Sequence, residues 1–340
     1  MPESRELKER GVNNLPAWGR RHFLKLGIAG LGVAGAAVAA RLLRSSPALT
    51  IQIPPLPPDL PTYGDGINPI ATCRQFDYGT LKQENGRTIR EFQITGQTTP
   101  LQLDAANSYV TWNYNGRLPG PTLRAKQGDR VRVVFLNKGG HSHTMHFHGM
   151  HPAEADGIKP VRNDTAAIYE FDAEPYGVHL YHCHVSPVSR HIGKGMYGMF
   201  IIDPPEGRPP ADEMVMVMAG YDLNDDNRNE LYAFNGLPNY YKQHPIAIYQ
   251  NQPVRLYLLN MIEHDAALTF HIHANFFRVY PTGMTLTPAY ETDVITMGTA
   301  ERHILEFTYK LPGKYMFHPH QDNIAEAGCM GVFDVIPRTS

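Results

Sequence analysis

Four short segments of the sequence occur twice, in the same order along the chain. Each copy begins with an apolar strand-like run, continues through two His-X-His pairs and ends with a glycine-containing apolar run. The matched segments are GDRVRVVFLN (128–137) with NQPVRLYLLN (251–260), TMHFHGM (144–150) with LTFHIHAN (268–275), YGVHLYHCHV (176–185) with PGKYMFHPHQ (312–321), and GMYGMFII (195–202) with GCMGVFDV (328–335). Because four matches share one order, they indicate a duplicated domain.

The repeated runs alternate apolar and polar residues and are separated by Gly, Pro and Asn, which is typical of half-buried antiparallel strands. The sequence therefore predicts an all-β protein of two tandem Greek-key β-sandwich domains. We expect the first domain at residues 86–204 and the second at 205–340. The turn-rich segment 203–213 would connect them. Prolines in residues 41–85 predict an extended arm before the first domain.

The N-terminus resembles an export signal. Arg20 and Arg21 precede a Gly/Ala-rich apolar run, 26–40, and this order resembles a twin-arginine signal. We expect residues 1–40 to be such a signal, and the protein to be periplasmic or extracellular without stable membrane association. An uncleaved anchor is the alternative. The formal net charge of -2 gives no reason to expect a nucleic-acid partner.

Histidines are concentrated in the repeats. Residues two apart on a strand share a face and lie roughly 6.5 Å apart, so each His-X-His pair can offer two imidazoles to one metal cluster. The pairs are His146/His148, His182/His184, His271/His273 and His318/His320. A metal such as zinc needs about four ligands, so eight converging histidines imply more than one ion. Ordinary strand histidines are the alternative, but four equivalent pairs argue against it.

The middle residue of one pair points to a different site. Cys183 faces the opposite side of its strand from His182 and His184, where it could meet His143, His191 and Met196. One Cys, two His and a weak axial Met form the blue (type 1) copper set. A structural zinc site and a buried inert Cys are the alternatives, although zinc would not normally recruit Met.

The second repeat serves as an internal control. It keeps its His-X-His pairs, but Leu268, Pro319 and Cys329 stand where the first repeat has the histidine, cysteine and methionine of the blue-copper set. The two ligand sets are therefore separable, and only the first domain is expected to hold blue copper. The sequence does not place Cys73 and Cys329 near one another, so a disulfide between them is left open.

The segments HTMHFHG, YHCHVSPVSRHIGKGM, HIH and FHPH resemble the copper motifs of the multicopper oxidases, the laccase-type family. The stretch LPGPTLRAKQGD (118–129) is similar to another part of that family. The resemblance covers roughly residues 87–338 and implies two cupredoxin-like domains. One departure is the interval from Cys183 to His191, which is longer than usual in the family and similar to that of copper nitrite reductases.

The resemblance implies four copper ions for each chain. It assigns type 1 copper to His143, Cys183, His191 and Met196, type 2 copper to His146 and His271, and the type 3 pair to His148, His182, His184, His273, His318 and His320. Asp156 resembles the family's acid near type 2 copper, so it is the predicted proton donor. An ordinary turn aspartate is the alternative reading of Asp156.

The family resemblance implies an oxidase that reduces O2 to water with electrons from a phenol, a metal ion or a redox protein. Two alternatives remain at this point: a copper nitrite reductase-like enzyme, and a non-catalytic copper or electron-transfer protein. The resemblance also implies a ring, most often a homotrimer, in which a first domain faces the second domain of a neighbouring chain and the copper cluster lies between them.

Overall fold

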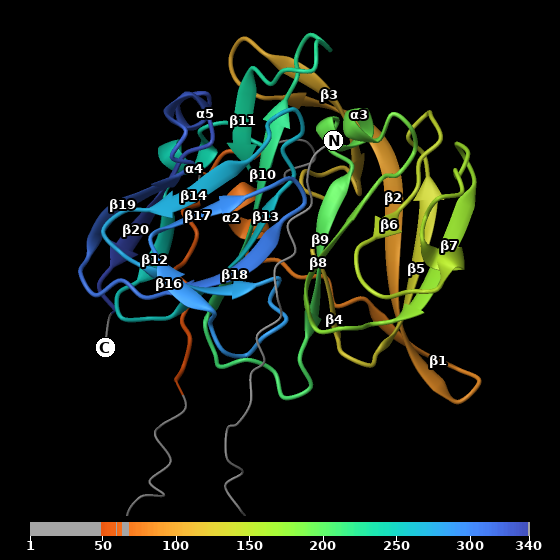
Figure 1. The fold of residues 1–340 in the computed structure, drawn as a ribbon, viewed down its shortest axis with the longest axis horizontal. Helices are drawn as coiled ribbons and strands as arrows, with labels where there is room; N and C mark the ends of the chain where they lie inside the picture. Colours follow the sequence, from red (N-terminus) through yellow and green to blue (C-terminus); the bar gives the residue numbers. More distant parts are fainter. Residues whose placement is uncertain (1–48, 59, 63–67, 339–340) are drawn as a thin grey trace, which may run out of the picture. The chain divides into compact units, whose positions relative to one another are not determined.

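Figure 1 shows the computed structural model, which describes residues 49–58, 60–62 and 68–338. These residues belong to one compact unit, Leu49–Ser340. The predicted export signal, residues 1–40, lies outside the described residues. Within the described part of the chain, no helix is both long and apolar enough to cross a bilayer.

The first domain consists of two sheets. One has the order β1-β2-β5-β7, with β3 paired to β2, and the other has the order β4-β9-β8-β6. Their strands are β1 (Thr80–Glu84), β2 (Arg87–Gln102), β3 (Ser108–Tyr114), β4 (Leu123–Lys126), β5 (Arg130–Asn137), β6 (His146–Phe147), β7 (Ala166–Asp172), β8 (Gly177–His182) and β9 (Tyr197–Asp203). β1 pairs with β2, so the first sheet begins before residue 86.

The second domain is also built from two sheets, with the orders β11-β10-β13-β18-β15-β16 and β12-β20-β19-β14-β17. Their strands are β10 (Asp212–Tyr221), β11 (Leu231–Phe234), β12 (Ile246–Tyr249), β13 (Val254–Asn260), β14 (Leu268–Ile272), β15 (Phe277–Pro281), β16 (Tyr290–Thr292), β17 (Val294–Met297), β18 (Arg302–Phe307), β19 (Gly313–His318) and β20 (Gly331–Ile336).

The pairing pattern repeats as the sequence does. β2 pairs with β5 in parallel, as β10 pairs with β13, and β4 pairs with β9 in parallel, as β12 pairs with β20. The predicted fold, two tandem all-β sandwiches, is therefore confirmed. The short helix α2 (Pro69–Thr72) precedes β1. The other short helices lie between strands, and they are η1 (Ala153–Ala155), α3 (Val188–Gly193), α4 (Tyr240–Gln243) and α5 (Asp322–Glu326).

The two domains share an apolar core. One buried cluster combines Val178, Leu180 and Met199 of the first domain with Tyr257 and Leu259 of the second. For this reason β10 and β13 are buried on both faces, whereas β5 alternates as the sequence predicts for a half-buried strand. Two hydrogen bonds to Val178 of β8 also join the domains (Figure 1): its main-chain N–H donates to the Thr282 carbonyl at 2.7 Å, and the Arg302 side chain of β18 donates to its carbonyl at 3.0 Å.

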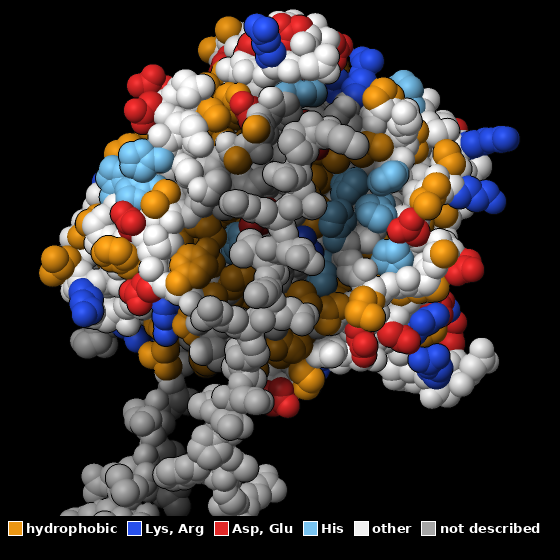
Figure 2. All heavy atoms as spheres, in the orientation of Figure 1, with side chains coloured by type: hydrophobic (Ala, Val, Ile, Leu, Met, Phe, Trp, Pro, Cys, Tyr) orange, Lys and Arg blue, Asp and Glu red, His pale blue; other side chains and the backbone are white. Residues whose placement is uncertain are grey.

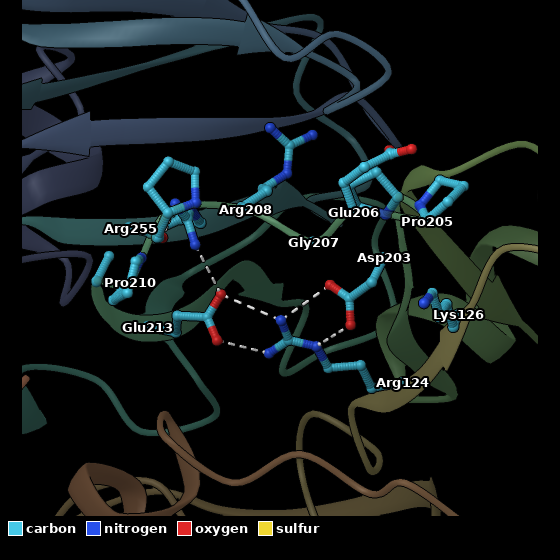
Figure 3. Close-up of a pocket in the computed structure, with 13 residues that line it drawn as sticks. Arg124, Lys126, Asp203, Pro205, Glu206, Gly207, Arg208, Pro210, Glu213 and Arg255 are labelled. Carbon is cyan, nitrogen blue, oxygen red and sulfur yellow. Dashed lines mark hydrogen bonds and ion pairs between the residues drawn. The ribbon is translucent and has the colours of Figure 1, made fainter. Parts of the chain in front are cut away.

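A buried arginine crosses the domain junction. Figure 3 shows Arg124 of β4 between Asp203, at the end of β9, and Glu213 of β10. Its guanidinium donates two hydrogen bonds to each carboxylate, at 2.8 and 2.9 Å to Asp203 and at 2.7 and 3.1 Å to Glu213. Arg255 of β13 reaches Glu213 from the second domain at 3.1 Å. These charges border a cavity of about 440 Å³.

The proline-rich arm lies along the second domain. Gln52 exchanges two hydrogen bonds with Gln252, and the Tyr240 hydroxyl donates to the Pro61 carbonyl at 2.6 Å. The side chain of Asn68 caps the helix α2 that follows the arm, because its oxygen accepts two N–H groups of the first turn. The arm is thus fixed at several points along its described length.

Candidate metal centres

Three of the side chains predicted for the blue-copper set meet in a buried group. The Sγ of Cys183 lies 3.1 Å from Nδ1 of His191 and 3.9 Å from Nδ1 of His143. The two Nδ1 atoms lie 3.2 Å from one another, and all three side chains are buried. Two imidazole nitrogens and one sulfur directed at a common point fit a trigonal His2Cys copper site.

Helix α3 accounts for the long interval between the cysteine and the second histidine. His191 lies within α3, and Met196 follows the helix. The Met196 N–H donates to the His191 carbonyl at 3.1 Å, and the Cys183 N–H donates to the Met196 carbonyl at 3.0 Å. Met196 is fully buried. The helix therefore returns the chain to Cys183, so the extra residues do not separate the predicted ligands.

His143 is held by its own loop. It exchanges two main-chain hydrogen bonds with Val161, at 3.0 and 3.1 Å. The buried Asn137 amide ties the loop together by donating to the carbonyls of His141 and Val161. Gly139 packs so closely that a Cβ there would lie 2.5 Å from the His143 ring. The ring is therefore confined to the position from which its Nδ1 faces Cys183.

Burial sets the protonation of this group. Burial, followed by the neighbouring imidazoles His191 and His141, lowers the pKa of His143 to about 4. Burial, followed by His141 and Arg190, lowers the pKa of His191 to about 4. Burial raises the pKa of the Cys183 thiol. The imidazoles are thus neutral, which is the metal-binding form, and a bound metal would displace the thiol proton.

Four imidazoles of the first domain form a second group, on the other face of the same strand region. His146 of β6 lies opposite His182 of β8 in the sheet register. The His146 ring centroid lies 5.2 Å from that of His148 and 5.1 Å from those of His182 and His184. The Nε2 atoms of His148 and His182 are 3.2 Å apart. Burial is the largest cause that lowers the pKa of His148 to about 3 and of His182 to about 4.

The second domain repeats this group. His271 of β14 lies opposite His318 of β19. The His271 ring centroid lies 5.2 Å from that of His273, 5.7 Å from that of His318 and 5.2 Å from that of His320. The Nε2 atoms of His273 and His318 are 2.9 Å apart. The structure therefore brings the two predicted pairs of each domain together.

Main-chain carbonyls orient the rings in both groups. The contacts are Nδ1 of His146 to Asp156 O at 2.7 Å, Nδ1 of His271 to Asp293 O at 2.7 Å, Nδ1 of His182 to Cys183 O at 3.0 Å and Nδ1 of His318 to Pro319 O at 2.8 Å. A histidine that donates through one nitrogen presents the other as a lone pair. Each of these rings can therefore offer Nε2 to a metal.

Two aspartates lie beside equivalent histidines. The carboxylate of Asp156 is 3.2 Å from Nδ1 of His146, and that of Asp293 is 3.8 Å from Nδ1 of His271. Sequence reasoning selected Asp156 but missed Asp293. Asp293 stands much further along the chain from its histidine, because the strands β15 and β16 intervene. Asp293 lies immediately before β17, and it reaches His271 because β17 pairs with β14. A sequence search could find it only by predicting that pairing.

The two groups of four imidazoles are separate within one chain. Among the described residues, no hydrogen bond or ring contact joins a histidine of one group to a histidine of the other. Figure 2 shows histidine side chains gathered over the β6–β8 region and, elsewhere, over the β14–β19 region. His184 and His320 are exposed, so each group reaches the surface. Each group alone is half of the predicted eight-histidine set.

Both domains of this chain match known proteins. Two family models, both described as multicopper oxidase, match residues 96–207 and 207–339. A crystal structure of a multicopper oxidase is 47% identical, with a TM-score of 0.78, and the match covers 80% of this chain and 98% of that one.

Two curated relatives are more distant. The copper-containing nitrite reductase of Neisseria gonorrhoeae is 27% identical, over 65% of this chain and 61% of its own length. Laccase-24 of Oryza sativa subsp. japonica is 29% identical, over 55% of this chain and 38% of its own length. The chain thus spans about three-fifths of the nitrite reductase. The two matched domains and the 47% identical structure, nearly all of which is covered, show that this chain belongs to the multicopper oxidases.

Proposed function

We propose that the protein is an oxidase that couples four one-electron oxidations of a small reductant to the reduction of O2 to water. The single observation that carries this proposal is the presence of two imidazole groups of equal size in addition to the Cys183 group. Eight histidines are enough to hold three further metal ions. Copper, when bound, supplies the one-electron chemistry and the reaction with O2.

The proposed ligand assignment is the one that the family resemblance implies. We assign type 1 copper to His143, Cys183, His191 and Met196, type 2 copper to His146 and His271, and the type 3 pair to the six remaining histidines of the His-X-His pairs. Support comes from the donor chemistry: neutral imidazoles, one soft sulfur and Nε2 atoms that approach each other in pairs. Cys183 lies between two proposed type 3 ligands, so covalent bonds connect the proposed sites.

The complete cluster requires a second copy of the chain in this proposal. Each chain presents a first-domain half and a second-domain half at different places, so a first domain would face the second domain of its neighbour. Such head-to-tail contacts close into a ring, and we propose a homotrimer. Mass measurement of the copper-loaded protein tests this proposal. A monomer that retains four coppers on dilution would contradict it.

We assign proton supply to Asp156, whose carboxylate approaches the proposed type 2 ligand His146. The main-chain carbonyl of Asp156 orients the ring, which leaves the carboxylate available to hold or pass a proton. Asp293 occupies a similar place beside His271. The two acids would therefore approach a shared cluster from two chains.

Copper counting tests the oxidase proposal most directly. We expect four coppers per chain, type 1 and type 2 EPR signals, and O2 consumption with a phenol or an oxidisable metal ion. The second candidate is a copper nitrite reductase, favoured by the 27% identical relative. It would leave most of the paired histidines without a role. Two coppers per chain with nitrite reduction would replace our proposal with this one.

The reductant and the location are proposals as well. Met145 and Met199 are fully buried, whereas Met150 is 64% exposed, so of these three methionines only Met150 could meet a metal-ion reductant. We propose a phenol, a metal ion or a redox protein as the reductant. The twin arginines Arg20 and Arg21 support export to the periplasm or beyond. Retention of the protein in the cytoplasm after substitution of both arginines by lysine would support the export proposal, and unchanged export would refute it.

A further inference from the structure

The indole of Trp112 lies against both imidazoles of the proposed type 1 site. Its ring centroid is 4.8 Å from that of His191 and 5.6 Å from that of His143. A third imidazole, His141, lies 5.0 Å from the same indole. His141 is exposed and Trp112 is partly exposed. A continuous set of aromatic contacts therefore runs from the surface to two predicted ligands.

Trp112 is fixed in this position from two sides. It lies on β3, where it pairs with Thr98 of β2. Its main-chain N–H donates to the carbonyl of Lys194, directly after the helix that carries His191, at 2.9 Å. The indole and His191 are thus attached to elements that are bonded to each other, so their ring contact is part of the fold.

The exposed residues that share the Trp112 face of the β2–β3 pair are uncharged. Thr98, Pro100 and Val110 are exposed beside it, and Val110 keeps 54% of its surface in contact with solvent. Pro100 lies opposite Val110, as Thr98 lies opposite Trp112, so these side chains share one face of the sheet. Together with His141 they form what we call the Trp112 patch. His141 is the only metal-ligating side chain of this patch, which holds no carboxylate for Mn(II) and no thioether or thiolate for Cu(I).

We propose that Trp112 is the docking residue for an aromatic reductant, a phenol or dihydroxybenzene, which stacks on the indole beside His141. This inference rests on the proposed function, because it names the substrate class of the proposed type 1 site. Offset or edge contacts between aromatic rings favour such a donor over a metal ion or a non-aromatic complex. In each encounter a dihydroxybenzene loses one proton to water and one electron to copper(II), which becomes copper(I), and leaves as a radical.

The kinetic test is anaerobic reduction of the blue absorption band by hydroquinone, compared with reduction by hexaammineruthenium(II). We expect Trp112→Leu to slow reduction by hydroquinone about three- to tenfold, which is the size of one aromatic contact. The ruthenium reaction should change less than about twofold. Trp112→Phe keeps a ring and should retain most of the rate. Ile168→Ala, which changes an exposed apolar residue of β7 outside the patch, is the control and should match the parent.

A binding test uses no turnover. The chain has two tryptophans, Trp18 and Trp112, so 5-fluorotryptophan labelling gives at most two fluorine signals. In anaerobic, fully copper(I) protein, hydroquinone can bind without reacting. We expect the Trp112 signal to shift on titration with hydroquinone. Cyclohexanediol, which has no aromatic ring, should leave it unmoved.

The outcomes separate docking from a structural role. An equal loss with both reductants, or a changed type 1 potential that accounts for the rates, would show that Trp112 only shapes the copper site and would overturn the proposal. Unchanged hydroquinone kinetics, or a fluorine signal that does not move, would overturn it too. Neither measurement needs O2, so a protein that docks hydroquinone yet consumes no O2 would refute the oxidase function alone.

Discussion

Replacing Arg124 by methionine should loosen the junction that positions the two domains. The substitution keeps most of the aliphatic volume but removes four charge-assisted hydrogen bonds to Asp203 and Glu213. Asp203 then loses both side-chain bonds that it accepts from Arg124. Glu213 keeps Arg255 and the Tyr257 hydroxyl, at 3.1 and 2.7 Å. The perturbation is therefore concentrated at one side of the junction in Figure 3.

The expected magnitude follows from burial. Breaking a buried ion pair by removing one partner typically costs about 3–5 kcal/mol. The Arg124 side chain is only 9% exposed, but Asp203 and Glu213 remain 24% and 22% exposed, so water can replace part of the lost contact. We therefore expect a loss of about 3 kcal/mol in unfolding free energy, the lower end of that range. The midpoint of thermal unfolding should fall by about 6 °C.

The assay is urea and thermal unfolding of copper-free protein at one protein concentration, because bound metal and association would both shift the midpoint. Arg130→Met is the matched control. Arg130 also contacts two carboxylates, Glu170 and Asp172, but within one sheet and nearer the solvent. Surface ion pairs contribute about 0–1 kcal/mol, so the control should change little. Equal losses in both variants, or less than about 1 kcal/mol in Arg124→Met, would refute the reasoning.

The pH dependence gives a second check on the same variant. Burial alone would raise the pKa of Glu213, but the hydrogen bond and charge of Arg124 outweigh it and hold this pKa below the ordinary value of 4.5. A carboxyl group whose pKa is lower in the folded than in the unfolded protein stabilises the fold. This stabilisation is complete when the pH is above the pKa of the unfolded protein, and it is lost as the pH falls through the pKa of the folded protein. The difference between parent and variant should therefore be complete above about pH 4.5 and shrink in more acidic solution.

Three further outcomes are expected. Gly139→Ala should remove the blue band and the type 1 EPR signal but leave the type 2 signal, because the new Cβ displaces the His143 ring; an unchanged blue band would contradict this. Asp156→Asn should keep all copper, since the backbone orients His146, while O2 reduction slows at least about tenfold; unimpaired turnover would rule out the relay. Copper-free, unfolded protein should titrate three free thiols that are unreactive when folded; a lower count would reveal a disulfide.

The repeat allowed the positions of the imidazole groups to be predicted without a structure. Two-residue spacing on a strand fixes which side chains share a face, and the sheet register then places His146 opposite His182 and His271 opposite His318. The same spacing placed Cys183 on the opposite face from its neighbours. These predictions depend only on the alternation of side chains along a strand, which can be read from the spacing of residues in the sequence.

The features that sequence reasoning missed depend on long-range packing. Trp112 lies far along the chain from His191, and their contact arises because β3 is bonded to the end of α3. Asp293 reaches His271 only because β17 pairs with β14 after the intervening strands β15 and β16. Neither contact leaves a periodic signal. The free, buried state of Cys73 likewise depends on how the second-domain core closes around it.

The second domain explains how one site can be absent while the other remains. Leu268, Cys329 and Ile324 are buried in its apolar core, in the region equivalent to the type 1 group of the first domain. The imidazoles of β14 and β19 lie on the other face of the same strands, so their carbonyl contacts and register do not depend on that core. Apolar packing on one face can therefore replace a metal site without disturbing the ligands on the opposite face. Because each strand lies between the two sites, residues on one of its faces can be replaced while the metal ligands on the other face are kept.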